Sequence, residues 1–521
     1  MISRRALALA VFLGSMSFTS LAQPVRAPRG PATATTQEAP ATRPAPQPAP
    51  VPVADKSSVT EHEMTVAGGK VLKYRATAGT LPVKDDAGKP KAGFFFTAYE
   101  LADQSAAQRE ARPITFVFNG GPGAAAIWLH LGTAGPKRID LNPEGYPAAP
   151  PYKLVDNPTT WLTTTDLVFV DPVGTGFSRP AEGVKGEEFY GVQQDIESVG
   201  EFIRTYLNRA NRWGSPKYLA GESYGTTRCA MLAEHLHDRY GMALSGVILI
   251  STVLNFQTIS ANSGNDLPYA LFFPTFTASA IYHKALATEL MADPEKLRKE
   301  VEAWVTEKYT PALLKGSSLR GEDRKAVVAA MARYSGLPEA FIEKNDLRVS
   351  PSEFQKELLA AKRQILGRFD GRILGDSTEP TSTHAEYDPS LSLYVGVYNS
   401  SFNRYVRQDL KFDSEHTYEF LSPRVHPWNW GGRGGNSGWL YVADNLQRAM
   451  SKNPHLRLLV CSGYYDMATP YFATDYTLNH MGLPERLRKN VRHTYYEGGH
   501  MMYHHYESLE KLNGDVNGFI K

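Results

Sequence analysis

The residues best placed to do chemistry are Gly221-Glu222-Ser223-Tyr224-Gly225. A short apolar run, residues 218–220, precedes them, and a helical pattern follows. Small residues around a serine let a strand turn sharply into a helix, which exposes the hydroxyl and directs the next backbone N–H at a developing oxyanion. We therefore interpret Ser223 as a nucleophile and the N–H of Tyr224 as one oxyanion donor. A tight turn without chemistry is the alternative.

A serine hydroxyl becomes a good nucleophile only when a histidine accepts its proton and a carboxylate orients that histidine. Two later segments supply these groups. The apolar run 456–461 leads into a turn that presents Asp466, and the run 491–496 opens into a glycine pair followed by His500. The order Ser223, Asp466, His500 is that of α/β-hydrolases. We predict that His500 is the general base and that Asp466 orients it.

Each partner of the serine has a simpler interpretation. Asp466 is compatible with an ordinary turn residue that accepts hydrogen bonds from its own backbone. His500 is followed by His504 and His505, but no companion pattern of ligands accompanies them, so we predict no metal site. His504 and His505 are interpreted as surface or core imidazoles.

A second oxyanion donor is expected from the segment Asn119-Gly120-Gly121-Pro122-Gly123. It directly follows an apolar run at residues 114–118 and lies upstream of the serine. Its glycines permit a backbone path in which an N–H points at the substrate oxygen. We assign Gly121 as this donor. A plain glycine- and proline-rich turn is the alternative.

The segments that must position these residues have the pattern of buried strands and amphipathic helices. Apolar runs without alternation predict strands covered on both faces; they lie at residues 114–118, 166–170, 246–250, 456–461 and 491–496. Amphipathic helices are predicted between them, at residues 194–207 and 227–240. The fold class is therefore α/β: an α/β-hydrolase sandwich whose core comprises residues 55–255 and 440–521.

Residues 256–439 interrupt this alternation of strands and helices. They contain long charged stretches with a helical pattern, at 294–315 and 351–367, and no clear strand–helix repeat. An insertion at this point would lie over the carboxyl ends of the strands, where open α/β sheets bind ligands. We predict a mainly helical lid domain.

The N-terminal region has the pattern of an export signal followed by an arm. Residues 1–22 combine Arg4 and Arg5 with a short apolar stretch and a small-residue cleavage site, and residues 23–54 are rich in Pro, Ala and Thr. We predict a periplasmic or secreted protein without stable membrane insertion. The formal charge of +2 falls to zero without the two signal arginines, so nucleic acid is not an expected partner.

The chain has only two cysteines, Cys229 and Cys461, which excludes a disulfide framework. Two small buried residues are the simpler interpretation, and a single bridge is the alternative.

Five segments together resemble the serine carboxypeptidase family. They are the glycine-rich segment 119–123, residues 157–161 with 170–178, the pentapeptide around Ser223, the turn with Asp466, and Gly-Gly-His-Met at 498–501. The resemblance covers about residues 60–255 and 440–521. It implies an α/β-hydrolase fold with an inserted cap and release of single residues from peptide C-termini, usually at acidic pH. Ala124 replaces the family's usual cysteine, in keeping with the missing disulfides.

The resemblance also implies a site for the terminal carboxylate of the substrate. In the family this group is held by an asparagine, a glycine and two glutamic acids that share a proton; Asn119, Gly120 and Glu222 match. The position of the second glutamic acid is Thr133, which cannot raise the pKa of Glu222 through a shared proton. His130, Lys137 or Arg138 are candidates for a compensating positive group, and Glu222 as an acceptor of backbone hydrogen bonds is the alternative.

The sequence thus predicts a serine-type carboxypeptidase that hydrolyses C-terminal residues of peptides through an acyl-enzyme and needs no cofactor. An esterase or acyltransferase on the same scaffold is the nearest alternative. A non-catalytic cell-envelope binding protein, tethered by the arm 23–54, is an alternative of another class. The side-chain preference of the pocket and the oligomeric state are left open.

Overall fold

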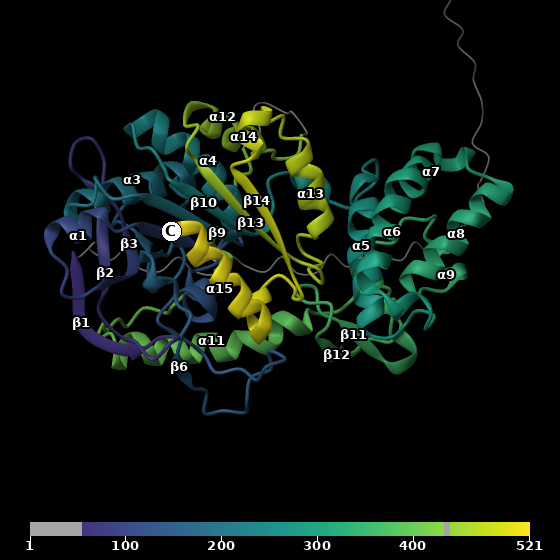
Figure 1. Ribbon diagram of the computed structural model, residues 1–521, viewed down its shortest axis with the longest axis horizontal. Helices are drawn as coiled ribbons and strands as arrows, with labels where there is room; N and C mark the ends of the chain where they lie inside the picture. Colours follow the sequence, from purple (N-terminus) through teal and green to yellow (C-terminus); the bar gives the residue numbers. More distant parts are fainter. Residues whose placement is uncertain (1–54, 432–437) are drawn as a thin grey trace, which may run out of the picture. The chain divides into compact units, whose positions relative to one another are not determined.

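A ten-stranded sheet runs through the residues that this computed structural model describes, 55–431 and 438–521 (Figure 1). The predicted signal peptide and arm lie outside them. The strand order is β1-β2-β3-β7-β4-β9-β10-β13-β14, with β8 paired to β3. The bounds are β1 Lys56–Thr65, β2 Val71–Lys84, β3 Pro90–Leu101, β4 Ile114–Phe118, β7 Asp166–Val170, β8 Arg179–Pro180, β9 Lys217–Ser223, β10 Gly246–Thr252, β13 Arg457–Gly463 and β14 Val491–Tyr496.

The sheet has two parts that differ in strand direction. From β7 to β14 the neighbouring strands are parallel, whereas β1, β2, β3 and β7 pair antiparallel. Strands β4, β7 and β14 coincide with the predicted apolar runs, and the predicted α/β fold is confirmed. The first three strands were not predicted, although the alternating burial of residues 71–76 is the period that marks a half-buried strand.

Helices cover both faces of the sheet, which explains why its central strands are apolar throughout. In β4, Phe116 and Phe118 belong to the core cluster shared with α3 and α4, whereas Val117 belongs to the cluster shared with α11 and α15. The helices bounding the sheet are α1 Ala106–Ala111, α2 Ile127–Leu129, α3 Val192–Ala210, α4 Tyr224–Tyr240, α12 Ala443–Lys452, α13 Tyr471–Asn479, α14 Glu485–Arg488 and α15 Tyr506–Ile520. A short pair, β5 (Lys137–Ile139) and β6 (Leu154–Asp156), lies outside the main sheet.

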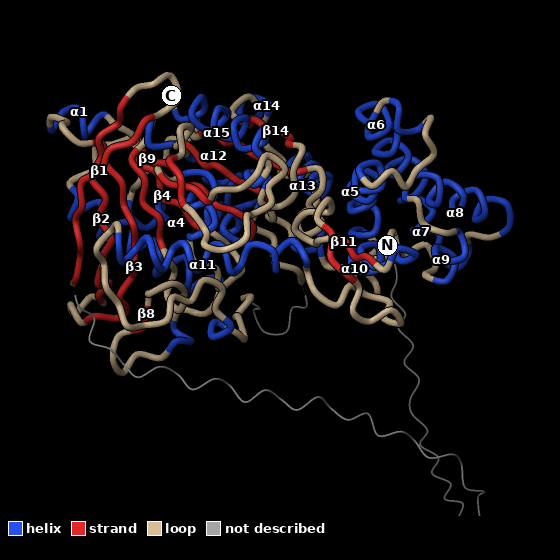
Figure 2. Tube along the Cα trace, turned by 90° about the horizontal axis from the view of Figure 1, so that it is seen from below, coloured by secondary structure: helices blue, strands red, loops and turns tan. Residues whose placement is uncertain are grey.

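Between β10 and β13 the chain is mainly helical, as predicted. Six helices share one hydrophobic cluster, to which Leu366 and Met467 also belong, and lie together away from the strands of the ten-stranded sheet (Figure 2). They are α5 Leu267–Tyr282, α6 Pro294–Trp304, α7 Thr310–Lys315, α8 Gly321–Ser335, α9 Glu339–Lys344 and α10 Pro351–Glu357.

The helical pattern predicted for residues 351–367 is wrong in its second half. Helix α10 ends at Glu357, and β11 (Gln364–Leu366) pairs with β12 (Leu374–Asp376). Arg363 has a left-handed backbone, φ 56°, and ends the short 3-10 turn Ala360–Lys362 that follows α10, and Ile365 and Leu366 are buried. Burial of this short apolar run therefore outweighs the helical pattern.

Helix α11 (Pro389–Gln408) returns from the insertion to the sheet. Its tyrosines Tyr394, Tyr398 and Tyr405 belong to the same core cluster as Val117. We propose that residues 256–439 form an inserted lid domain, in which α11 is the helix that packs on the core of the ten-stranded sheet. Among the described residues, no helix has both the length and the apolar character needed to cross a bilayer.

Candidate active site

Strand β9 ends at Ser223 and helix α4 begins at the next residue, Tyr224. Ser223 has φ 60° and ψ −129°, a conformation that non-glycine residues rarely adopt and that is typical of a strained strand-to-helix turn. The turn is so tight that a Cβ on Gly221 would lie 2.2 Å from the carbonyl oxygen of Gly225. The small residues around Ser223 are therefore a steric requirement of the elbow.

Asp466 and His500 lie close together in the loops that follow the carboxyl ends of β13 and β14. Nδ1 of His500 lies 2.8 Å from Oδ2 of Asp466, and both side chains are buried. Asp466 also accepts hydrogen bonds from the backbone N–H groups of Ala468 and Thr469 and from the hydroxyl of Thr469, at 2.7–2.9 Å. With Nδ1 facing a carboxylate, Nε2 of His500 is the nitrogen left to accept a proton.

The surroundings of His500 set its charge and its orientation. Burial alone would lower its pKa, but the nearby charge and hydrogen bond of Asp466 and the charge of Glu222 outweigh burial and raise the pKa above its ordinary value. The imidazole stacks on Phe369 with 4.7 Å between ring centroids, and the hydroxyl of Ser251 donates to the backbone carbonyl of His500 at 2.6 Å.

Ser223 and His500 line one cavity of about 160 Å³. Asn119, Gly120, Gly121, Glu222 and Tyr224 line it as well, so the structure brings together all the predicted site residues except Asp466, which lies behind His500. No direct hydrogen bond joins the Ser223 hydroxyl to His500 in the described part of the chain; such bonds often tighten only with substrate.

The glycine-rich segment lies against the elbow. A Cβ on Gly120 would be 2.4 Å from the backbone nitrogen of Tyr224, and Gly121 has φ 96°, in the region that favours glycine. Both candidate oxyanion donors, Gly121 and Tyr224, therefore border the same cavity as the Ser223 hydroxyl.

Glu222 is buried beside the nucleophile and accepts two hydrogen bonds. Nδ2 of Asn119 donates to Oε1 at 2.9 Å, and the hydroxyl of Tyr503 donates to Oε2 at 2.7 Å. Burial raises the pKa of Glu222 to about 7, although His500 and these two hydrogen bonds act to lower it. The group can therefore hold a proton at mildly acidic pH.

Comparison with known proteins decides the family. Residues 69–513 match the family model described as serine carboxypeptidase. This chain belongs to the serine carboxypeptidase family. It is a serine hydrolase with the α/β-hydrolase fold, as the residue order Ser223, Asp466, His500 had predicted.

Individual relatives are distant from this member of the family. Serine carboxypeptidase-like 30 of Arabidopsis thaliana is 22% identical over 442 residues, which is 79% of this chain and 76% of that protein. Serine-type carboxypeptidase F of Aspergillus niger is 32% identical over 115 residues, 21% of this chain and 19% of that protein. The crystal structure of Kex1(delta)p, a prohormone-processing carboxypeptidase from Saccharomyces cerevisiae, aligns with a TM-score of 0.49 and 14% identity, covering 85% of this chain and 91% of that one.

Thr133, at the position expected for the family's second glutamic acid, does not face the cavity. Its hydroxyl donates to Oδ1 of Asn513 in α15 at 2.6 Å. Thr133 therefore shares no proton with Glu222, and it is mainly burial, together with the charge of Asp466, that raises the pKa of Glu222. Glu222 accepts a hydrogen bond from Tyr503 instead, a residue that no sequence motif marks.

None of the three suggested compensating cations lies in the active-site cavity. His130 is buried against Tyr99, and burial lowers its pKa to about 3, so it is neutral. Lys137 pairs with Asp156 at 2.5 Å. Arg138 lines a separate space of about 10 Å³ behind Tyr503.

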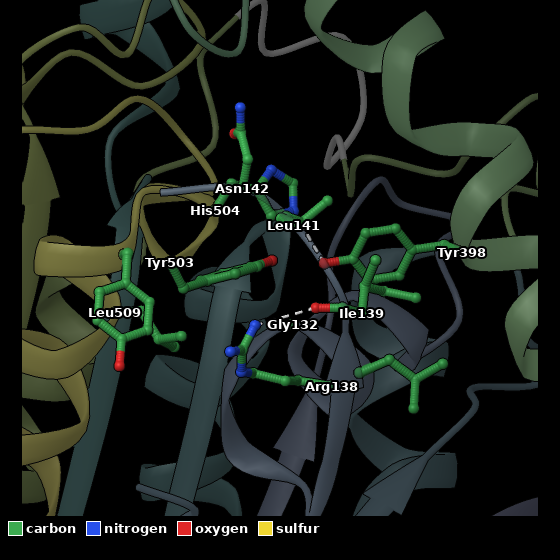
Figure 3. A pocket seen from close by; sticks show the side chains of 11 residues that line it. Gly132, Arg138, Ile139, Leu141, Asn142, Tyr398, Tyr503, His504 and Leu509 are labelled. Carbon is green, nitrogen blue, oxygen red and sulfur yellow. Dashed lines mark hydrogen bonds between the residues drawn. The ribbon is translucent and has the colours of Figure 1, made fainter. Parts of the chain in front are cut away.

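Figure 3 shows this small space, with Tyr503, Tyr398 and His504 around Gly132. The hydroxyl of Tyr398 lies 2.8 Å from Nε2 of His504, and burial lowers the pKa of His504 to about 3. A Cβ on Gly132 would be 2.3 Å from the Tyr503 ring, so the glycine allows this close packing. Tyr503 is thus fixed between the core and Glu222.

Other predicted features have structural roles. His504 is a core imidazole and His505 is half-buried. Cys229 and Cys461 are both buried and have free thiols. Within residues 55–431 and 438–521, no three His, Cys, Asp or Glu side chains gather as metal ligands.

Proposed function

We propose that this protein is a serine-type carboxypeptidase that releases single residues from peptide C-termini through an acyl-enzyme on Ser223. The observation that carries the proposal is the buried His500–Asp466 pair at the wall of the cavity that Ser223 lines, in a chain that matches the family over residues 69–513.

In the proposed reaction, the Ser223 oxygen attacks the carbonyl carbon of the last peptide bond while Nε2 of His500 takes the hydroxyl proton. Asp466 holds His500 in the tautomer that this transfer needs. The N–H groups of Gly121 and Tyr224 stabilise the oxyanion. His500 then passes the proton to the leaving amine, and water, activated by the same histidine, hydrolyses the ester.

We further propose that Asn119, Gly120 and Glu222 hold the terminal carboxylate of the substrate. An ionised carboxylate can accept a hydrogen bond from a protonated carboxyl group, and burial of Glu222 favours that protonated form. The reaction uses no cofactor. Export of the protein, proposed from the pattern of residues 1–22, is a further part of this proposal.

The test is digestion of a synthetic peptide with a free or an amidated C-terminus, read by mass spectrometry. We expect stepwise loss of C-terminal residues from the free peptide, no loss with Ser223→Ala, and normal loss with the exposed control Ser317→Ala. Full activity of Ser223→Ala would refute the proposed nucleophile. Turnover of esters or acyl transfer to alcohols, without peptide trimming, would favour the esterase or acyltransferase alternative instead.

A further inference from the structure

One charged side chain of the active-site cavity takes no part in the machinery described above. Arg368, from the insertion, lines the cavity with Ser223 and His500. Its guanidinium lies 5.4 Å from the centre of the Phe369 ring, and this ring stacks in turn on His500. The ring of Phe369 therefore lies between the guanidinium of Arg368 and the imidazole of His500.

The backbone that carries Arg368 is tied to both loops of the catalytic pair. The carbonyl of Arg368 accepts the N–H of Met467 at 3.0 Å, and that of Phe369 accepts the N–H of His500 at 2.5 Å. Oδ2 of Asp370 accepts the N–H of Gly499 at 3.2 Å. Because these bonds fix the segment on either side of the site, the position of Arg368 is set relative to His500.

The charge of Arg368 is available to a ligand. In the described residues, no ion pair involves Arg368. The neighbouring Asp388 accepts a hydrogen bond from the backbone N–H of Arg368 and none from the guanidinium group. The same carboxylate caps α11 through the N–H and hydroxyl of Ser390. The acidic group of the cavity, Glu222, is hydrogen-bonded to Asn119 and Tyr503 and makes no ion pair with Arg368.

We propose that Arg368 is an anion subsite that binds a carboxylate of the substrate on the leaving side of the scissile bond. Guanidinium groups stacked on an aromatic ring keep their N–H edge free, and that edge matches a carboxylate with two parallel hydrogen bonds. This inference rests on the proposed function. The carboxylate is either the terminal one, which Arg368 would then bind together with Asn119, Gly120 and Glu222 in the same cavity, or an acidic side chain of the last residue; both supply the same chemistry.

The test compares wild type, Arg368→Gln and Arg368→Lys on three peptides that share one scissile bond. One ends in a neutral residue with a free carboxylate, one in the same residue as an amide, and one in an amidated aspartate. We expect Arg368→Gln to raise KM about 10- to 100-fold for peptides that carry the recognised carboxylate, with kcat changed less than about threefold. Arg368→Lys should recover part of the loss, because it keeps the charge.

Controls separate the possible outcomes. Arg320→Gln removes an exposed arginine elsewhere in the insertion and should leave all KM values unchanged; melting temperatures verify that each variant is folded. A KM increase confined to the free terminal carboxylate or to the aspartate identifies which group is bound. An equal effect on all three peptides would overturn the subsite, while failure of the wild type to cleave any of them would refute the proposed function instead.

Discussion

At the scale of single residues, Glu222 is hydrogen-bonded to Tyr503 and not to a second glutamic acid, which is where the site differs most from the expected pattern. Its hydroxyl donates to Oε2 of Glu222, which stabilises the ionised carboxylate. We predict that Tyr503→Phe raises the pKa of Glu222 further, because a hydrogen bond to a charged group contributes about 1.5 kcal/mol, or about one pKa unit. The pH at which KM for a free-carboxylate peptide begins to rise should move upward accordingly.

The matched control is Tyr398→Phe. This variant also removes one buried tyrosine hydroxyl, but that hydroxyl bonds to His504 and not to Glu222. KM measured against pH for both variants tests the role of Tyr503. An equal shift in the two variants, or none in Tyr503→Phe, would show that Tyr503 only fills space.

At the scale of elements, the loop after β4 must touch the turn between β9 and α4. Gly120 allows this contact, since a Cβ there would lie 2.4 Å from the Tyr224 nitrogen and 2.8 Å from the Glu222 carbonyl oxygen. We predict that Gly120→Ala displaces the oxyanion donors and lowers kcat by about 10²- to 10³-fold, the usual effect of losing one donor.

Gly514→Ala is the control for this substitution. Gly514 lies inside α15, and nothing lies within 4 Å of its added Cβ, so activity should be retained. Steady-state kinetics with an ester and a peptide substrate would check both variants. Near-normal kcat in a folded Gly120→Ala protein would contradict the oxyanion assignment.

The elements also show what sequence reasoning can find. Ser223, Asp466 and His500 each lie in the turn after an apolar run, so the local pattern placed all three at one edge of the sheet. Tyr503 and Arg368 were not found, because their roles depend on contacts made only in the tertiary structure. The raised pKa of Glu222 could not be predicted from the sequence either, because burial is a property of the folded chain.

At the scale of the whole molecule, residues that follow the sheet strands and residues of the insertion line one cavity, and burial of Glu222 at this cavity sets the pH dependence of the site. Burial raises the pKa of Glu222 to about 7, so its proton is present below that pH and lost above it. We predict that KM for a peptide with a free C-terminus increases as pH rises through about 7, whereas KM for an amide or ester without a carboxylate does not.

The histidine acts in the opposite direction. His500 is buried, but Asp466 raises its pKa above the ordinary value of a histidine. We therefore expect kcat to fall as pH decreases through that pKa, because the general base becomes protonated. Profiles of kcat and KM recorded separately from pH 4 to 8 would distinguish the two groups. A KM independent of pH for the free peptide would contradict the proposed role of Glu222.

The most direct test of the central claim is covalent labelling with a fluorophosphonate, followed by intact-mass measurement and peptide mapping. If Ser223 is activated by His500 and Asp466, the wild-type protein gains one adduct on Ser223, Ser223→Ala gains none, and His500→Ala reacts far more slowly. A folded wild-type protein that remains unlabelled, or an adduct located on another residue, would contradict the claim.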